Sequence, residues 1–324
     1  MPGLFGPLAE LEHHPWPQLP RLEALLARAD RDEEPVGYTA ALFGRFGITP
    51  DPGKDLPGAA VAFLADTGAR PPGFVLHADP LQLLPDRDQL LAFDLDDEPL
   101  DGDEIASVVT AFNAHFSDEG LRLQGSPSGR IYLHSESAPD LRTHPLSVVL
   151  GRNLDPCLPE GNDQQRWRGL LNETQMLCHS LDFNRERECR GQPVLGGLWF
   201  SGGGSLPSGG KAAVGRVIGD CPVARGLVAL VAGSGGDELV VESEFEAAVT
   251  RGDAARWLRA LTDLEARLPR LQDCAALYVH ACDGSVYRWH ARAARRWWRR
   301  RRPLVDWIHS DRAVTRGLRD DNGV

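Results

Sequence analysis

The stretch GGLWFSGGG at residues 196–204 constrains the fold of this chain more than any other part of the sequence. Its apolar, aromatic run is typical of a buried strand, and the glycines after it let a neighbouring group approach the backbone closely. A second glycine pair and Lys211 follow. The stretch therefore predicts a strand that leads either into a phosphate-binding loop or into a tight turn.

The two nucleotide-binding motifs with glycine-rich loops do not fit this stretch. A P-loop requires a glycine where Ser205 stands and a hydroxyl after the lysine, where Ala212 stands. A dinucleotide fingerprint lacks its third glycine because Pro207 occupies that position. We therefore expect no nucleotide cofactor.

Composition limits the class of protein. A chain of 324 residues with 42% apolar content can bury a substantial core. No run of 18 apolar residues occurs and the first residues do not resemble a signal peptide, so we expect a cytoplasmic protein without membrane contact. Six cysteines without a C-x-x-C pair predict neither a metal site nor a disulfide framework. The net charge of −11 argues against a general nucleic-acid binder.

Local patterns predict an α/β fold with mixed sheets. Apolar runs bounded by Pro, Gly and Asp predict strands or buried segments at 58–66, 73–79 and 89–95. Asp101 and Glu104 have capping-box spacing at the start of a helix. Further patterns predict short helices near 19–30 and 292–303, longer helices over 163–181 and 253–268, and hairpins over 121–135 and 275–291.

These patterns predict four consecutive regions. Residues 1–54 form a Pro/Gly-rich lead with one short helix, and residues 55–205 form the main α/β region. Residues 206–305 supply a helix and a hairpin, and residues 306–324 form a tail.

A polar stripe on the predicted helix at 163–181 is the candidate ligand-binding surface. It carries Asn172, Gln175 and His179, and it can equally be a solvated face. The residues that follow favour a ligand, because guanidinium groups and exposed backbone N–H groups together suit an anion. The candidate ligand-binding residues are Asn172, Gln175, His179, Asn184, Arg187, Gly202, Gly203 and Gly204.

The run NETQMLCHSLDFNRERECRGQPVLGGLWFSGGG resembles the RpfE-type regulatory proteins of bacteria. The runs LHADPLQLLPDRDQLLAFD, NAHFSDEGL, PLSVVLGRNLDPCLPEG and RRWWRRRRPL are also similar to that family, so the resemblance covers most of residues 55–305. Two positions depart from the family pattern, where Gly196 replaces an asparagine and Ser201 replaces a tryptophan.

The same region has a fainter likeness to the archaeal-type, cofactor-independent phosphoglycerate mutases. The shared skeleton falls on His179, Asn184, Arg187, Gly191, Pro193, Gly202 and Gly204. In the mutases this part belongs to a segment inserted into an alkaline-phosphatase-like domain, so the likeness implies substrate handling and a region 55–205 similar to that insertion.

The likeness does not carry over the catalytic groups. Mutase chemistry needs two divalent metals and a serine nucleophile. Residues 1–57 contain no counterpart of the Asp-Gly-x-x-Asp element that begins the metal site. His280, Asp283 and His290 fall in a predicted hairpin, where we expect His280 to share a face with Tyr278, Tyr287 and Trp289. We therefore expect no catalytic residue, no metal ligand and no cofactor.

The leading interpretation is a non-catalytic regulatory or ligand-sensing protein that binds a small phosphorylated or carboxylated ligand, or a protein partner. The alternatives are an active phosphoglycerate-mutase-like enzyme or phosphatase, and a nucleic-acid-binding regulator. The last would use the arginine-rich helix near 292–303, which we instead expect to dock on the fold through Trp298.

Overall fold

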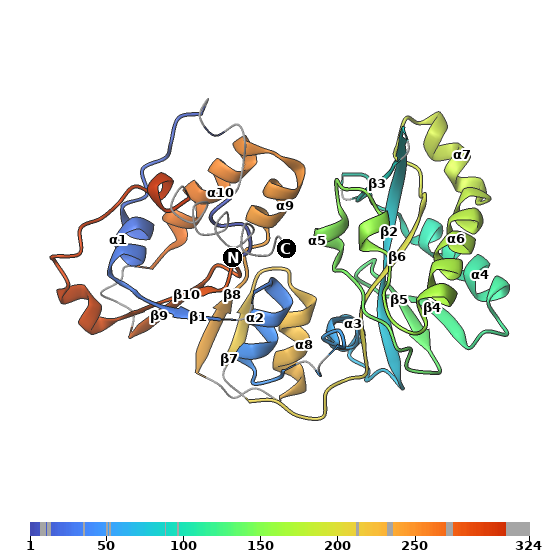
Figure 1. The fold of residues 1–324 in the computed structure, drawn as a ribbon, viewed down its shortest axis with the longest axis horizontal. Helices are drawn as coiled ribbons and strands as arrows, with labels where there is room; N and C mark the ends of the chain where they lie inside the picture. The colour runs from blue at the N-terminus through green and yellow to red at the C-terminus, as the bar shows by residue number, and fades with distance from the viewer. Residues whose placement is uncertain are drawn as a thin grey trace, which may run out of the picture. The chain divides into compact units, whose positions relative to one another are not determined.

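The computed structural model has a mixed α/β fold, as predicted, and its contacts divide the chain into two compact units (Figure 1). Unit 1 comprises residues 1–41 and 242–324, and unit 2 comprises residues 42–241. The structure describes residues 1–6, 11, 14–34, 36–49, 51, 53–87, 89–95, 97–211, 214–231, 236–269 and 275–308. The predicted tail lies outside the described residues from 309 onward.

The division into units does not coincide with the four predicted regions. The N-terminal lead forms one unit with the C-terminal region, because strand β1 (Asp30–Glu33) pairs antiparallel with β10 (Ser285–His290). The predicted boundary at residues 205 and 206 falls inside unit 2.

The long strand β2 (Phe74–Asp86) organises unit 2. Its first half pairs antiparallel with β5 (Ile131–Ser135), and β5 pairs in turn with β4 (Leu121–Gly125). Its second half pairs with β3 (Gln89–Phe93), and β6 (Gly197–Gly204) pairs along its other edge. The predicted strands at 73–79 and 89–95 and the hairpin over 121–135 are thereby confirmed.

Helices cover both faces of this sheet (Figure 1). On one face lie α4 (Gly102–His115), α6 (Gln164–His179) and α7 (Asp182–Cys189), and their apolar side chains share a core with alternate residues of the strands. On the other face lies α3 (Gly58–Thr67), packed against Val75 and Tyr132. The capping box of α4 is present as predicted, with both Asp101 and Glu104 bonded across the first turn.

The prediction of a strand at 58–66 is wrong, because these residues form α3. Six consecutive residues from Gly58 to Phe63 are buried, so the run shows neither helical nor strand periodicity. Three of those six residues are alanines, which favour a helix when burial does not decide.

A parallel β-α-β element completes unit 2. Strand β7 (Val214–Ile218) and strand β8 (Asp237–Val240) are joined through α8 (Pro222–Leu230). At the contact with α3, a Cβ at Gly226 would lie 2.0 Å from the carbonyl oxygen of Val61, so only glycine allows this approach. The helix α2 (Tyr38–Arg45) precedes these elements in the chain.

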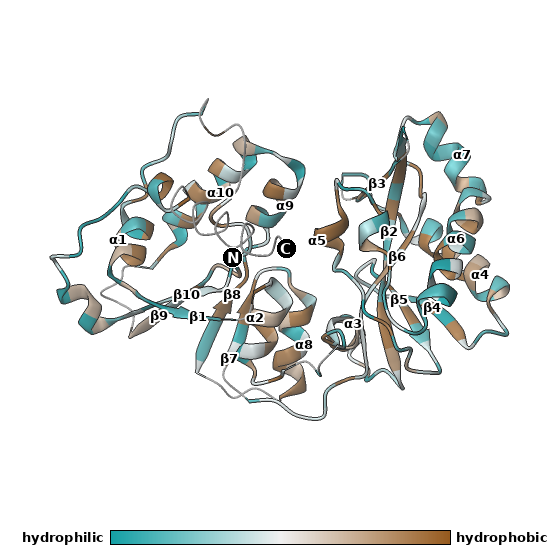
Figure 2. Ribbon diagram, viewed as in Figure 1, coloured by the Kyte–Doolittle hydropathy of each residue, from teal (hydrophilic) through white to brown (hydrophobic). Residues whose placement is uncertain are grey.

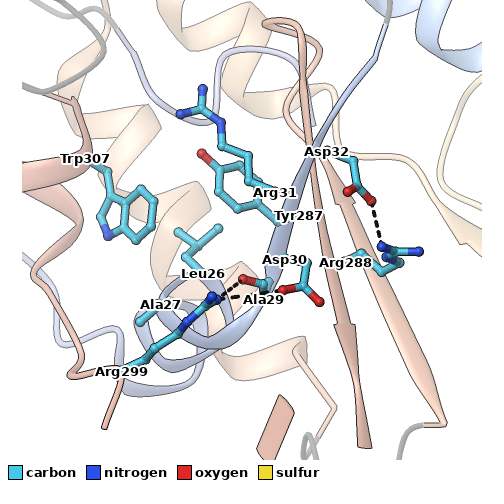
Figure 3. A pocket seen from close by; sticks show the side chains of 10 residues that line it. All are labelled: Leu26, Ala27, Ala29, Asp30, Arg31, Asp32, Tyr287, Arg288, Arg299 and Trp307. Carbon is cyan, nitrogen blue, oxygen red and sulfur yellow. Dashed lines mark hydrogen bonds and ion pairs between the residues drawn. The ribbon is translucent and has the colours of Figure 1, made fainter. Parts of the chain in front are cut away.

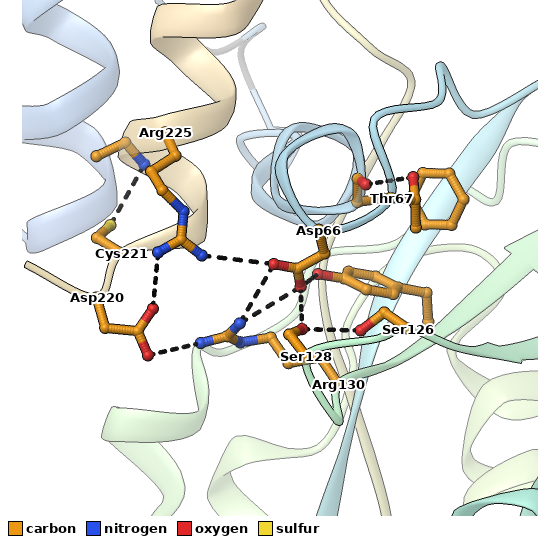
Figure 4. Close-up of polar contacts among 11 residues, drawn as sticks. Asp66, Thr67, Ser126, Ser128, Arg130, Asp220, Cys221 and Arg225 are labelled. Carbon is orange, nitrogen blue, oxygen red and sulfur yellow. Dashed lines mark hydrogen bonds and ion pairs between the residues drawn. The ribbon is translucent and has the colours of Figure 1, made fainter. Parts of the chain in front are cut away.

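A buried carboxylate ties α3, β5 and α8 together (Figure 4). Asp66, whose side chain is 1% exposed, accepts hydrogen bonds of 2.7 Å from the hydroxyls of Tyr132 and Ser128. The guanidinium groups of Arg130 and Arg225 lie 3.3 Å and 3.6 Å from its other oxygen. This network is fully internal, and we assign it a structural role.

Unit 1 is built on an antiparallel sheet of order β1, β10 and β9 (Ala276–His280). The predicted hairpin over 275–291 is confirmed, since His280 pairs with Val286. That register puts His280 on the same face as Tyr278, as predicted, but on the opposite face from Tyr287 and Trp289, so that part of the prediction is wrong. His280 also contacts Glu34 at 2.5 Å. The helices α1 (Pro20–Arg28), α9 (Glu244–Arg251) and α10 (Ala254–Arg267) pack with the buried face of the sheet in one core.

Two further short helical elements, both in unit 2, are α5 (Leu146–Val149) and η2 (Asp155–Cys157).

The predicted helix over 292–303 is wrong. A short 3-10 turn, η4 (Ala291–Arg295), ends before the tryptophans, and residues 296–303 have no helical structure. Trp298 does not dock on the fold, because it is 63% exposed. The segment is held instead by Ala293, which is buried, and by Arg296, whose guanidinium binds Asp30.

Candidate functional site

The two buried residues of α7 are both polar, and both belong to the predicted ligand-binding set. Asn184 donates to the carbonyl oxygens of Cys178 and Leu195 at 2.8 Å and 2.9 Å, and its own side-chain oxygen accepts from the N–H of Leu195. Figure 2 shows α7 as hydrophilic along its length, in contrast to α8. Asn184 therefore fixes the chain before β6 by satisfying buried backbone groups.

Arg187 is 2% exposed and is bonded within the protein on three sides. Its Nε donates to the carbonyl oxygen of Pro193 at 2.8 Å, and its Nη1 donates to Glu104 at 2.7 Å. Its Nη2 donates to the carbonyl oxygen of Glu98. The same Glu104 oxygen accepts from the N–H of Asp101, so the arginine also supports the cap of α4.

The stripe on α6 does not face these buried groups. Asn172 and His179 are exposed, and Gln175 is half-buried beside Gly197, where a Cβ would lie 3.2 Å from the glutamine side chain.

The three glycines at the end of β6 serve close packing. A Cβ at Gly204 would lie 2.5 Å from Cβ of Pro57, and a Cβ at Gly203 would lie 2.8 Å from the ring of Phe74. The N–H of Gly202 donates to the hydroxyl of Thr143 at 3.2 Å. These glycines, after which the sequence predicts a phosphate-binding loop or a tight turn, thus form the end of strand β6.

A half-buried carboxylate lies at this end of β6. Asp55 accepts from the backbone N–H and the hydroxyl of Thr143, and from the N–H of Gly203. Burial raises the pKa of Asp55 despite these bonds. Two of the glycine N–H groups therefore bind protein oxygens.

The structure does not bring all of the predicted residues to one place. Asn184 and Arg187 lie in α7 on the α4 side of the sheet, whereas Gly202 lies beside His77 and the start of α3 (Figure 1). The ligand-binding role of the eight residues stays a prediction.

A cavity of about 580 Å³ lies in unit 1 between α1, β1, β10 and the chain near Trp307 (Figure 3). We call it the unit 1 hollow. Its lining is Leu26, Ala27, Ala29, Asp30, Arg31, Asp32, Tyr287, Arg288, Arg299 and Trp307. The volume lies in the range of small-molecule sites.

Aromatic and guanidinium groups face one another in the hollow. The ring centroids of Tyr287 and Trp307 are 5.8 Å apart, with ring planes at 81°. The guanidinium of Arg31 lies 5.8 Å from the centroid of the Tyr287 ring. Arg299 approaches from the opposite side and donates to the carbonyl oxygen of Ala29 at 2.9 Å.

The acidic side chains of the hollow are paired with basic ones. Asp30 accepts two hydrogen bonds from Arg296, at 2.6 Å and 2.9 Å, and it also contacts His290. These bonds lower the pKa of Asp30, and the Arg296 hydrogen bond is the largest cause. Asp32 pairs with Arg288 at 3.2 Å. Arg31 donates to the hydroxyl of Ser285 at 3.0 Å, and Arg299 lies 3.9 Å from Asp30. The lining thus holds three guanidinium groups and two carboxylates.

The hollow is only weakly indicated by the sequence. Its strand β1 reads DRDE, which lacks the apolar residues typical of strands, and its partner strand lies about 250 residues away in the chain. The arginines near position 299 form a visible basic cluster in the sequence, but the sequence predicts a helix there, and residues 296–303 have no helical structure.

Neither a metal-binding cluster nor a membrane-spanning helix is found among the described residues. Among the described residues, no group of three or more His, Cys, Asp or Glu side chains is arranged to hold a metal ion. Within the described helices, none is long and apolar enough to cross a membrane.

Comparison with models of protein families and with curated protein sequences gives no match. Among solved structures, the chain is similar to the cofactor-independent phosphoglycerate mutase of Thermoplasma acidophilum, with 16% identity, a TM-score of 0.36 and coverage of 88% of this chain and 86% of that one. It is also similar to the PH0037 protein of Pyrococcus horikoshii, with 13% identity and a TM-score of 0.36; the match covers 73% of this chain and 57% of that protein. Both likenesses are distant.

Proposed function

We propose that this protein is a non-catalytic, ligand-sensing regulatory protein that binds a small phosphorylated or carboxylated molecule in the unit 1 hollow. The observation that supports this proposal is the combination of Arg31 and Arg299 with the rings of Tyr287 and Trp307 around one cavity. Guanidinium groups bind phosphate or carboxylate through charge-assisted hydrogen bonds, and the aromatic rings suit a flat apolar part.

The sequence resemblance supports a binding role over a catalytic one. The sequence lacks the metal ligands and the serine nucleophile of the mutases. The purified protein should therefore not interconvert phosphoglycerates with manganese, cobalt or zinc. Turnover of about 1 per second or more, abolished by a chelator, would favour the active enzyme instead. The substrate-handling skeleton falls in unit 2, where Asn184 and Arg187 bond within the protein, so it does not itself support binding in the unit 1 hollow.

Calorimetric titration tests the binding site directly. The probes are phenyl phosphate, which combines a flat ring with a phosphate, 3-phosphoglycerate and inorganic phosphate. We expect phenyl phosphate to bind most tightly, because only it offers both groups that the hollow can contact.

The variant Arg299→Gln should weaken the binding of phenyl phosphate by a factor of about 10 or more, since one charge-assisted contact contributes about 1.5–3 kcal/mol. Arg185→Gln, on the exposed side of α7, removes the same charge and should leave binding unchanged. If none of the probes binds at millimolar concentration, or if both variants behave alike, the hollow is not the ligand site.

A further inference from the structure

Residues 291–302 form a basic surface, of which Arg299 alone lines the unit 1 hollow. We call this stretch the Arg-Trp segment; it contains seven arginines, two tryptophans and no acidic residue. Ala293 is buried, and Arg296 donates to the carbonyl oxygen of Arg28 at 2.9 Å as well as to Asp30. The segment is therefore anchored to the end of α1, so its exposed side chains project from a fixed backbone.

Two large aromatic side chains of the segment face solvent. Trp297 is 80% exposed and Trp298 is 63% exposed, and their ring centroids are 6.2 Å apart with ring planes at 82°. An indole that is buried on folding adds several kcal/mol to the free energy of unfolding. The two neighbouring indoles here are exposed, so they do not make that contribution. Adjacent exposed aromatic residues of this size are typical of an interaction surface.

The arginines of the segment fall into two groups. Arg296 and Arg299 bind α1 and Asp30, and Arg301 lies 3.6 Å from Glu23. The remaining four are exposed, and their guanidinium groups have no ion pair or hydrogen bond to a described residue: Arg292, Arg295, Arg300 and Arg302. Four uncompensated positive charges thus surround the two indoles.

From this juxtaposition we infer that the Arg-Trp segment binds single-stranded nucleic acid. Each base has a flat face that can stack on an exposed indole, and such stacking contributes about 1–3 kcal/mol per base without sequence preference. Guanidinium groups beside the rings neutralise the phosphates that connect stacked bases, and this releases counterions. The chemistry of the ligand is therefore an unpaired base together with its phosphate backbone.

The geometry favours single strands over duplex DNA and over a lipid surface. The segment is irregular after Arg295, so it presents neither a helix nor a paired strand to a major groove. An interfacial membrane anchor needs a broad apolar face, whereas Trp297 and Trp298 are flanked by arginines on both sides. The net charge of −11 opposes binding at long range, so contact depends on the segment itself.

Fluorescence anisotropy of a labelled 30-nucleotide oligo-dT, titrated with the full chain, tests this inference. Four arginine–phosphate contacts predict a slope of about −2.8 in a plot of log affinity against log salt concentration, which is a loss of about 50-fold between 50 and 200 mM salt. The double variant Trp297→Ala/Trp298→Ala should weaken binding by at least about 10-fold. Trp297→Phe/Trp298→Phe keeps a stacking face and should retain most of the affinity.

A charge-matched pair of variants identifies the arginines. Arg300→Gln/Arg302→Gln should lower the salt slope by about 1.4, whereas Arg185→Gln/Arg190→Gln on α7 should leave both affinity and slope unchanged. Arg299 is kept intact because it also lines the unit 1 hollow, so failure here does not affect the proposed ligand site. Absence of binding at 50 mM salt, equal losses in the two pairs, or binding of phosphatidylglycerol vesicles with the oligonucleotide inert would overturn the inference.

Discussion

Helix α7 and the Arg-Trp segment are both rich in arginine, yet they differ in what their arginines contact. In α7, Arg187 is buried because Glu104 of α4 and the carbonyl oxygen of Glu98, which precedes α4, serve as its acceptors. In the Arg-Trp segment, the nearby acceptors are Asp30, Glu23 and the end of α1, and they engage three of seven arginines. Whether an arginine is structural or available to a partner therefore depends on the acidic side chains and carbonyl oxygens that a distant element supplies.

The comparison is tested most strongly at Arg187. Arg187→Ala removes the donor to Glu104 and to the carbonyl oxygens of Pro193 and Glu98, so we expect a loss of about 3–5 kcal/mol in the free energy of unfolding. Urea denaturation, followed through a signal from unit 2, measures this loss of unfolding free energy. Arg190→Ala, on the exposed side of the same helix, should change stability by less than about 0.5 kcal/mol. Equal effects of the two variants would show that burial of Arg187 does not matter.

His77 extends the comparison to a half-buried imidazole that is neutral at pH 7. Burial and the charge of Arg130 lower the pKa of His77 from 6.5 to about 4, against the opposing effect of Asp66. The unfolded chain therefore takes up a proton below pH 6.5 that the folded chain takes up only near pH 4. Stability from this group is complete above pH 6.5 and is lost as the pH falls towards 4, by up to about 3 kcal/mol.

The variant His77→Phe keeps a ring against Tyr132, whose centroid lies 5.6 Å away, and removes the titration. The difference in unfolding free energy between variant and wild type should shift in favour of the variant by about 2–3 kcal/mol between pH 7 and pH 4.5. Parallel pH profiles for the two proteins would mean that His77 titrates normally in the fold.

Gly204 tests the claim that the glycines of β6 serve packing. In Gly204→Ala the new methyl group would meet Pro57 at 2.5 Å, so we expect a loss of about 1–3 kcal/mol, measured by thermal and urea denaturation. Gly209→Ala is the matched control, because a Cβ there meets nothing within 4 Å. If Gly204→Ala is as stable as Gly209→Ala, the glycine is required for something other than packing.

The smallest effect is expected in the Arg-Trp segment. Because Trp298 is 63% exposed, Trp298→Ala should change the free energy of unfolding by less than about 0.5 kcal/mol. Trp289→Ala provides the contrast, since Trp289 is 1% exposed in the core of unit 1 and its truncation should cost about 3–5 kcal/mol. A large loss of stability in Trp298→Ala would instead support the docked helix that the sequence predicts.

Local signals in the sequence predicted the elements whose causes are local. The capping box of Asp101 and Glu104, the helix at 254–267 and the hairpin over 276–290 all depend on residues within a few positions of one another. The helix α3 was missed because its burial on all sides removes the periodicity that separates helix from strand.

The candidate site could not be predicted because its contacts are long-range. Arg187 meets Glu104 across 83 positions, and Asp30 meets Arg296 across 266 positions. Single-sequence patterns carry no information about such pairs. The sequence predicts Arg187, Asn184 and Gly204 as ligand-binding residues, but its patterns cannot separate a bond to the protein from a bond to a ligand.

Hydrogen exchange with phenyl phosphate, resolved by peptide, tests most directly whether binding belongs to unit 1 or to the residues that the sequence had selected. Our account predicts slower exchange at 26–32 and 285–308, the segments that line the unit 1 hollow, and unchanged exchange at 179–204. Slower exchange confined to 179–204 would contradict it and would return the ligand to the predicted residues of α7 and β6.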